Sequence, residues 1–252
     1  AWFNGEDTAE IKTIVALEES AETRIDLLDD GRVAGYIYDG SNRQVFSSAS
    51  SYEDNSWHHT VFIANGNNHS LYVDGVFQDS IEYARTAIGG IEAIGARNTG
   101  TAYDYDFQGQ IDQVQIWDRA LSSNEVLNLY NGSVNNTNYF GKYAQSGDFK
   151  SLVFYNESST YWNITQSIAD SDYVDTLSYV NTTGLVSYFR FDGDVTDSVG
   201  LNDGTNSGSS DTVGIVKHAR SFDGVDDYVN ISDDQSLRFS TKDYSFCIWV
   251  KT

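Results

Sequence analysis

Aspartate is the residue type through which this sequence offers most of its chemistry. Among 252 residues, 37 are acidic and 15 are basic, which gives a formal net charge of −22, and aspartate outnumbers glutamate by 27 to 10. Thirteen of the 27 aspartates stand beside glycine or another aspartate in turn-like clusters. Turns of this kind present the carboxylate oxygens that Ca²⁺ prefers as ligands. The negative electrostatic potential of such a chain repels nucleic acid and anionic membrane surfaces. The composition therefore favours cations as partners and excludes nucleic acid.

Catalytic motifs are not apparent in the sequence. A retaining glycosidase needs two carboxylates about 5–5.5 Å apart, but the ten glutamates are scattered and no Glu-x-Asp-x-x-Glu strand appears. The sequence also contains no Gly-x-Ser-x-Gly elbow, no P-loop and no dinucleotide fingerprint. We therefore predict that the chain is not an enzyme and has no catalytic residues.

Histidine and cysteine offer less chemistry than aspartate. His58 and His59 follow Trp57 directly, and consecutive side chains of a strand point to opposite faces, so these two imidazoles cannot bind one metal together. The single cysteine, Cys247, lies in the apolar run FCIWV, where we expect a buried, inert thiol. No apolar stretch approaches the roughly 20 residues that span a bilayer, so we expect no direct membrane insertion.

The first residue of the chain and its asparagines both bear on where the protein is located. The chain opens with Ala1 rather than Met, so we expect a processed product or an excised piece and infer targeting indirectly. Repeated Asn-x-Ser/Thr triplets predict a glycosylated protein that is extracellular or displayed on the cell surface, although an Asn- and Ser-rich loop composition would produce some of them by chance. The candidate glycosylation residues are Asn68, Asn131, Asn135, Asn156, Asn163, Asn181 and Asn230.

Short apolar or alternating runs bounded by Gly, Asn and Asp predict the elements that position these residues. Many short strands at regular spacing, separated by Gly-containing turns, are typical of a sandwich or jelly roll. Asp74 and Gly75 supply the positive-φ pair of a tight hairpin. The predicted strands are 11–17, 24–28, 32–38, 44–48, 57–64, 70–73, 91–95, 108–117, 151–155, 161–166, 185–191, 220–222, 228–231 and 244–251.

One short helix is predicted, followed by a polar connector. Residues 122–125 read Ser-Ser-Asn-Glu, a capping box, and Val126, Leu127 and Tyr130 then provide a small apolar stripe. The segment 132–183 is rich in Asn, Ser and Tyr and has little apolar surface, so we interpret it as a glycosylated connector with short strands that does not fold alone.

Two long stretches carry ordered sets of motifs. Residues 184–252 contain SYFRFDGDVTDSVGLNDGTNSG, HARSFDGVDDYVNISDD and YSFCIWVKT, and residues 1–131 contain SWHHTVFIANGNNHSLYVDGVFQDS and FQGQIDQVQIWDRALSSNEVLNLY. They resemble the first and second halves, respectively, of a laminin G-like domain of the concanavalin A type. The resemblance implies an all-β fold, an antiparallel β-sandwich or jelly roll in permuted or split order, with 132–183 as a small β-containing connector.

The order of the two halves is reversed relative to that family. The halves could pair within one chain, pair between neighbouring chains that complete each other, or belong to a window on a longer tandem array. Half a sandwich exposes an apolar face and open strand edges, so each half must be covered. Closure within one chain benefits from covalent linkage, whereas head-to-tail completion between chains gives an open polymer.

The resemblance also implies a structural calcium ion as cofactor. Its ligands match Asp192 of the FDG motif, the turn Asn202-Asp203-Gly204 and Asp112 of GQIDQVQI. Asp112 and Asp192 belong to different halves, so the ion would hold the halves together. The alternative is that the Asp-Gly pairs form turns and the remaining carboxylates are solvated. Further carboxylates that could serve the same or a second site are Asp197, Asp223, Asp226 and Asp227.

These observations favour a non-catalytic structural or adhesive glycoprotein outside the cell. We expect a repeat or subunit of a larger array or filament, with copies of itself or neighbouring repeats as partners and with glycans or surface proteins as further candidates. The alternative is a carbohydrate-binding module of a larger secreted protein, with Tyr103 and Tyr105, or Tyr36 and Tyr38, as a sugar platform. A glycan array would separate the two hypotheses.

Overall fold

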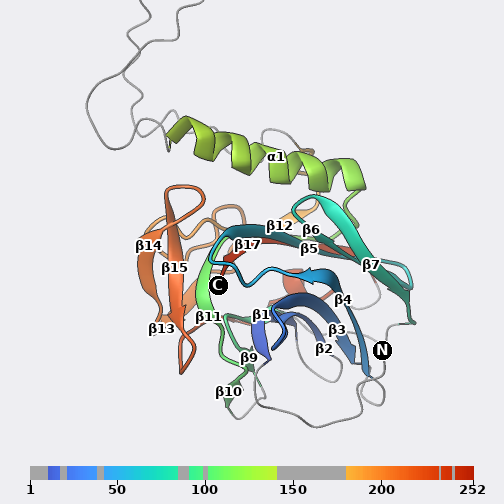
Figure 1. The fold of residues 1–252 in the computed structure, drawn as a ribbon, viewed down its shortest axis with the longest axis horizontal. Helices are drawn as coiled ribbons and strands as arrows, with labels where there is room; N and C mark the ends of the chain where they lie inside the picture. The colour runs from blue at the N-terminus through green and yellow to red at the C-terminus, as the bar shows by residue number, and fades with distance from the viewer. Residues whose placement is uncertain are drawn as a thin grey trace, which may run out of the picture.

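The protein folds as two antiparallel β-sheets packed face to face, with one helix over the outer side of one sheet (Figure 1). We call the sheet that contains β1 sheet A and the sheet that contains β11 sheet B. The computed structural model describes residues 11–17, 22–38, 43–84, 91–98, 102–140, 180–232, 234–239 and 242–252.

Each sheet has a fixed spatial order of strands. Sheet A runs β13 (Gly204–Ser207), β16 (Tyr228–Ile231), β8 (Ile91–Ile94), β1 (Lys12–Leu17), β2 (Glu22–Leu27), β3 (Arg32–Tyr38) and β4 (Arg43–Ser51). Sheet B runs β14 (Ser210–Val213), β15 (His218–Asp223), β11 (Gln108–Trp117), β17 (Tyr244–Lys251), β5 (Trp57–Asn65), β6 (Asn68–Val73) and β7 (Val76–Glu82), and β12 (Leu185–Phe189) also pairs with β11. A small hairpin joins β9 (Arg97–Asn98) to β10 (Tyr103–Asp104).

Strands from the two halves of the sequence interleave in both sheets. In sheet B, β17 lies between β5 and β11 and pairs with both. Strands β12 and β15, also from the second half, pair with β11, and in sheet A β16 pairs with β8. The last strand therefore pairs within its own chain, and a single sandwich is built in permuted order, as the resemblance implied.

The main core lies between the sheets and takes side chains from both halves. Phe62 of β5 stacks on Tyr244 of β17 at 6.0 Å between ring centroids, and Phe107 meets Phe222 edge to face at 6.4 Å. All four rings are buried. Burial of one such side chain contributes roughly 2–3 kcal/mol, so separation of the halves would expose a large apolar face on each.

A second, smaller core lies between sheet B and α1 (Ser123–Phe140) (Figure 1). Val126 and Leu129 of the helix are buried against Trp117, Tyr188 and Cys247 on the outer face of the sheet. Burial raises the pKa of the Cys247 thiol far above its ordinary value. Cys247 is therefore buried, as expected from the sequence, and the helix shields the outer face of the central strands.

The predicted elements agree with the described strands, with three differences. The helix starts at the predicted capping box but continues to Phe140, past the predicted boundary at residue 131. The predicted strands did not include β9, β10, β13 or β14, because these short strands consist largely of polar residues. They also did not include β7, although the predicted hairpin at Asp74 and Gly75 implied a strand after it. The strands predicted at 151–155 and 161–166 lie outside the described residues.

Candidate cation site at the junction of the two halves

Strand β11 changes its pairing partner in the middle of its length. Residues 108–111 pair with β15, and residues 114–117 pair with β12. The register against β17 also shifts between Asp112 and Gln115, and Gln113 has a φ of 51°. A local bulge of this kind redirects side chains. Asp112 and Gln113 are consequently left between two ladders, where loops of the second half cover them.

The Asp112 side chain is enclosed by one of these loops, the turn 214–218. Asp112 is completely buried (0 % exposed), and its Oδ2 accepts a hydrogen bond from the backbone N–H of Val216 at 3.0 Å. Its Oδ1 accepts one from Nε2 of Gln113 at 3.2 Å. A Cβ at Gly214 would lie 2.4 Å from Asp112 Oδ2 and 2.4 Å from the carbonyl oxygen of His218. Only glycine therefore allows this close approach.

A second carboxylate contacts the same turn. Asp192 lies in the loop after β12, and its Oδ1 accepts a hydrogen bond from the backbone N–H of His218 at 3.3 Å. Burial raises the pKa of Asp192 above its ordinary value of 3.8. Burial, with a further contribution from the charge of Asp192, raises the pKa of Asp112 well above 3.8. The charge of Asp192 therefore reaches Asp112 across the junction of the halves.

This acidic pair fits a hard cation. None of the ion pairs among the described residues includes Asp112 or Asp192. Although burial raises the pKa of the half-buried Asp192, the charges of Lys217, Arg190 and His218 lower it in part. The hydrogen bonds described for the buried Asp112, in contrast, come from neutral N–H groups, and a buried carboxylate without a compensating charge costs several kcal/mol.

Left-handed backbone at Gln113, Phe191 and Lys217, with φ of 51°, 57° and 55°, surrounds the pair. Such conformations cost about 1 kcal/mol or more each and concentrate at binding sites. Carboxylate and carbonyl oxygens are the donors that Ca²⁺ takes.

Two of the other predicted ligands, Asn202 and Asp203, lie beside Asp197, and the backbone N–H of the third, Gly204, donates to the carbonyl of Val195 at 2.9 Å. Asp203 Oδ1 accepts a hydrogen bond from the Asp197 N–H at 2.9 Å, and the Asn202 N–H donates to Asp197 Oδ2 at 3.3 Å. The Asn202 amide also donates to Ser187 Oγ at 2.8 Å. Although burial opposes ionisation of Asp197, backbone N–H groups lower its pKa below 3.8. These residues brace a loop, and none of the hydrogen bonds described for them reaches Asp112.

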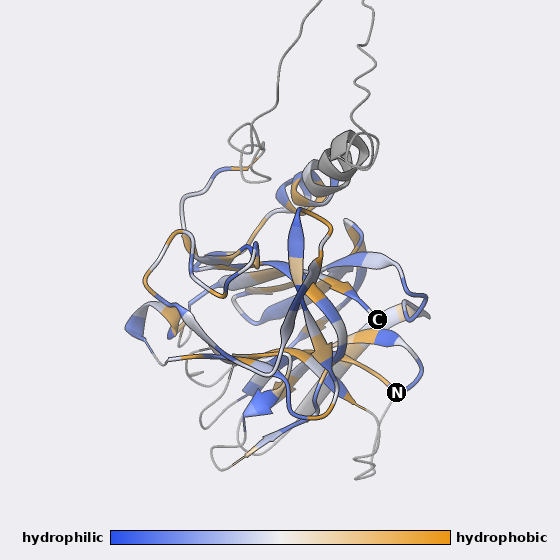
Figure 2. Cartoon of the chain, turned by 90° about the vertical axis from the view of Figure 1, so that its left-hand side faces the viewer, coloured by the Kyte–Doolittle hydropathy of each residue, from blue (hydrophilic) through white to orange (hydrophobic). Residues whose placement is uncertain are grey.

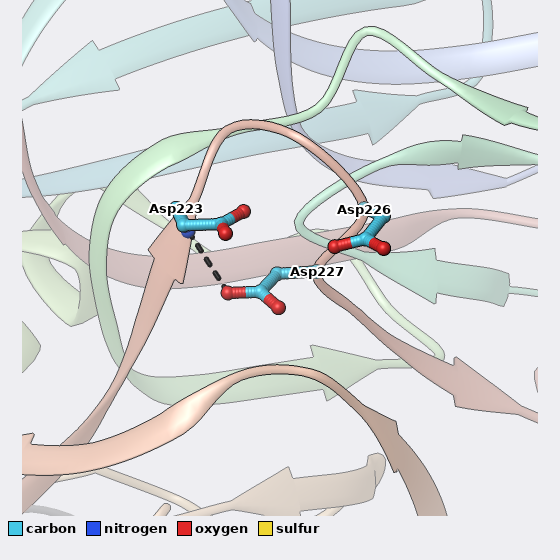
Figure 3. Close-up of side chains that lie close together, drawn as sticks. All are labelled: Asp223, Asp226 and Asp227. Carbon is cyan, nitrogen blue, oxygen red and sulfur yellow. Dashed lines mark hydrogen bonds between the residues drawn. The ribbon is translucent and has the colours of Figure 1, made fainter.

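The remaining carboxylates predicted as possible ligands form a turn between β15 and β16. Ligand oxygens of Asp223, Asp226 and Asp227 lie within 4.8 Å of one another (Figure 3). Asp227 Oδ2 accepts a hydrogen bond from the Asp223 N–H at 2.9 Å, and Asp223 Oδ1 accepts one from the Val225 N–H at 2.9 Å. Asp223 and Asp226 are exposed. These bonds account for the cluster as turn structure.

The two adjacent histidines occupy different environments. His58 lies between two carboxylates, with Nδ1 2.8 Å from Asp74 Oδ2 and Nε2 3.1 Å from Asp54 Oδ1. His59 is buried, and its ring lies 5.1 Å from that of Trp249. The pair therefore does not form a joint metal site, as the alternation of a strand predicts.

Tyrosines considered as a sugar platform interact with arginines on the outer face of sheet A. The Arg24 guanidinium lies 3.9 Å from the Tyr36 ring centroid and 5.3 Å from that of Tyr105, and Arg97 lies 4.2 Å from Tyr105. The Tyr103 ring stacks on Tyr228 at 3.6 Å. Three of the four candidate tyrosines are thus engaged in intramolecular stacking.

The glycosylation candidates differ in accessibility. Asn68, Asn131 and Asn181 are exposed. Asn230 is only partly exposed, and its Oδ1 accepts a hydrogen bond from the Tyr103 hydroxyl at 3.2 Å. Asn135 lies in α1, and Asn156 and Asn163 lie outside the described residues.

Several residues at the cation site were not identified from the sequence. Gln113 and the turn 214–218 carry no recognisable motif, because their contribution comes from the bulge in β11 and from backbone groups. The only local signal was Gly214, one glycine among 21 in the chain.

The sandwich places the chain in a known structural class, that of the antiparallel jelly rolls typified by concanavalin A. The chain belongs to the Laminin_G_3 family, described as the concanavalin A-like lectin/glucanases superfamily, whose model matches residues 1–127. The resemblance expected from the sequence is therefore confirmed.

Other comparisons add little. One solved structure, described as an S-layer domain-containing protein (residues 221–444) from Clostridium thermocellum, is 21 % identical. The match covers 52 % of this chain and 67 % of that one, with a TM-score of 0.27, a likeness too low to support an argument. No curated protein matches the chain in sequence. None of the described helices has the length and apolarity needed to cross a membrane.

Proposed function

We propose that this chain is a non-catalytic structural or adhesive unit of an extracellular surface protein, supported by a structural Ca²⁺ ion. The observation that carries the proposal is that the fully buried carboxylate of Asp112 and the half-buried carboxylate of Asp192, from different halves of the sandwich, both accept hydrogen bonds from the turn 214–218. When bound, the ion would supply positive charge and oxygen coordination. Asp112 and Asp192 would hold it.

The non-catalytic part of the proposal is supported by the carboxylates of sheet A. Glu22 and Asp26 point to the same outer face of β2 as Arg24, which lies between them in sequence and forms ion pairs with both. Asp26 also accepts a hydrogen bond from Thr13 at 2.9 Å. A glycosidase needs one carboxyl group as an acid and another free to attack or to activate water. Carboxylates held by arginine are poorly suited to both tasks.

Carbohydrate binding is the alternative, because the superfamily includes lectins. The stacking of Tyr36, Tyr103 and Tyr105 within the molecule disfavours these residues as a sugar platform. A glycan array with the intact chain tests this alternative. Specific binding that is lost in Tyr103→Ala would favour the carbohydrate-binding module over the structural unit.

Calcium-dependent stability tests the proposed ion. At a Ca²⁺ concentration 100 times the dissociation constant, the free energy of unfolding rises by about 2.7 kcal/mol, which corresponds to a rise in Tm of roughly 5–10 °C for a domain of this size. We expect this shift on adding Ca²⁺ after chelation, measured by calorimetry. Asp112→Asn should lose the shift, because the amide removes the charge while keeping the shape.

The matched control is Asp30→Asn, which removes an exposed carboxylate that forms an ion pair with Arg32. This variant should retain the whole calcium response. An unchanged Tm of the unmodified chain in chelator and in Ca²⁺ would contradict the proposed cation site.

A further inference from the structure

Asparagine followed directly by glycine is a chemically labile pair, and this chain contains Asn4-Gly5, Asn65-Gly66 and Asn131-Gly132. The first pair lies outside the described residues. Glycine has no side chain to shield its backbone nitrogen or to restrict rotation of the chain, so that nitrogen can reach the side-chain amide carbon of the asparagine before it. The two described pairs are equivalent in sequence but lie in different structural surroundings.

Asn65 and Gly66 lie at an exposed hairpin. Asn65 ends β5 and pairs with Asn68 at the start of β6, and both Asn65 and Gly66 are exposed. Gly66 has a φ of 56°, and among the described residues only its chain neighbours come within 4 Å of a Cβ built on it. Because the backbone of an exposed turn opens locally at little cost in free energy, the Gly66 nitrogen can approach the Asn65 side chain without disturbing the core.

Asn131 and Gly132 lie inside α1 instead. Asn131 is exposed, but Gly132 is buried. In the interior of an α-helix each backbone N–H donates to the carbonyl one turn earlier, so the Gly132 nitrogen is held along the helix axis. Attack on the Asn131 side chain would require the helix to unwind at this point and to lift Gly132 out of its buried position.

A contact from the second half of the chain holds the reactive nitrogen of the hairpin. The Gly66 N–H donates to Oδ1 of Asp243 at 2.7 Å. Asp243 directly precedes β17, whose first residue, Tyr244, pairs with Ala64. A hydrogen bond to a carboxylate is stronger than one to a neutral acceptor. This bond must break before the Gly66 nitrogen can turn toward Asn65, so Asp243 slows the approach.

We infer that Asn65 is a site of spontaneous deamidation and that Asp243 restrains its rate. The Gly66 nitrogen loses its proton to hydroxide and attacks Cγ of Asn65. The new N–Cγ bond closes a succinimide ring, the Cγ–Nδ2 bond breaks, and the amide nitrogen leaves as ammonia after taking a proton from water. Water then opens the ring to aspartate or isoaspartate. The net reaction consumes water and releases ammonia, and it does not depend on the proposed cation site.

Deamidation adds a carboxylate at a place where the two halves meet. The new negative charge stands one residue from the N–H group that Asp243 holds, and like charges at so short a distance repel each other. In isoaspartate the main chain also runs through the former side chain, which lengthens the backbone at the end of β5. The modification should therefore weaken the contact between the β5–β6 hairpin and the start of β17.

Peptide mapping by mass spectrometry tests the inference. The intact chain is incubated at alkaline pH, and fragmentation of its peptides localises the mass gain of deamidation. Asn65 should be modified at least about 10-fold faster than Asn131, because only the hairpin opens at low cost. In urea the two rates should become similar. Equal rates at Asn65 and Asn131 in the folded chain, or no gain at Asn65 in the time that the unfolded chain reacts, would overturn the inference.

Two variants test the restraint by Asp243. Asp243→Ala should speed deamidation of Asn65 about 10-fold, because it removes a hydrogen bond to a charged group. Asp243→Asn keeps a carbonyl acceptor and should change the rate far less. The rate at Asn131 is the internal control and should stay the same. Slower deamidation of Asn65 in Asp243→Ala would show that the carboxylate promotes the attack, and equal acceleration at Asn65 and Asn131 would show general loosening. Either result would overturn the restraint.

Discussion

At the residue scale, the sequence predicted the acidic pair but not its surroundings. Asp112 and Asp192 lie in motifs of the family, and the structure brings both against one turn. Asn202 and Asp203 also lie in a motif, yet they bind Asp197. A motif preserves residue types, whereas the ligand set depends on which loop covers the bulge in β11. Tertiary packing determines which loop covers the bulge, and the order of residues along the chain does not reveal it.

His58 and His59 predict opposite effects of pH on stability. The carboxylate of Asp74 raises the pKa of His58 above its ordinary value of 6.5, with Asp54 also contributing. Burial lowers the pKa of His59 from 6.5 to about 4. A raised pKa stabilises the fold below pH 6.5, and this contribution is lost as the pH rises through the folded pKa. A lowered pKa stabilises the fold above pH 6.5, and this contribution is lost as the pH falls toward 4.

We therefore expect opposite changes in the pH profiles of two variants. Between pH 6.5 and pH 4, burial of neutral His59 should cost the unmodified chain on the order of 3 kcal/mol of unfolding free energy. The His59→Gln variant should not show this decrease. Above pH 6.5, the free energy of unfolding of the unmodified chain should decrease by a smaller amount as His58 loses its proton, and His58→Gln should not show this decrease. Urea unfolding from pH 4 to pH 9 measures both. Profiles of the two variants that parallel the unmodified chain would contradict the assignment.

At the element scale, local rules predicted the start of α1 but not its end. Ser122 and Glu125 form the expected capping box, with the Ser122 N–H donating to Glu125 Oε2 at 2.9 Å. The Arg119 guanidinium, together with Ser122, lowers the pKa of Glu125 from 4.5 to about 2. No proline interrupts the sequence after residue 131, so the helix continues through polar residues that the pattern assigned to a connector. Apolar periodicity detects only the turns of a helix that pack on a core.

Glu125→Gln is expected to weaken both the helix start and its contact with Arg119. The loss should be about 1 kcal/mol at neutral pH, typical of a capping interaction. Because the pKa of Glu125 is lowered, its contribution is present above pH 4.5 and disappears as the pH falls toward 2. Chemical unfolding at pH 7 and at pH 2.5 measures the difference. A variant equally destabilised at both values would show that the carboxylate charge is not involved.

At the scale of the whole molecule, apolar and polar residues are interspersed along the strands (Figure 2), and the buried apolar side chains form the core between the sheets. The alternation that produces this arrangement is visible in the sequence, so the sandwich could be predicted. Its closure could not, because pairing of β17 with β5 joins residues far apart in sequence. Closure within a chain and closure between chains make the same contacts. The linear pattern is equally compatible with both.

The net charge of −22 sets the ionic conditions under which this sandwich is stable. Self-repulsion of the surface carboxylates destabilises the compact state, and salt shortens the Debye length from about 10 Å at 0.1 M to about 3 Å at 1 M. We expect the free energy of unfolding, measured in urea with chelator present, to rise steadily with NaCl over this range. Asp112→Asn should rise in parallel, because screening acts on exposed charges far more than on a buried one. If only the unmodified chain responded to NaCl, the repulsion that salt relieves would involve Asp112 and not the surface carboxylates.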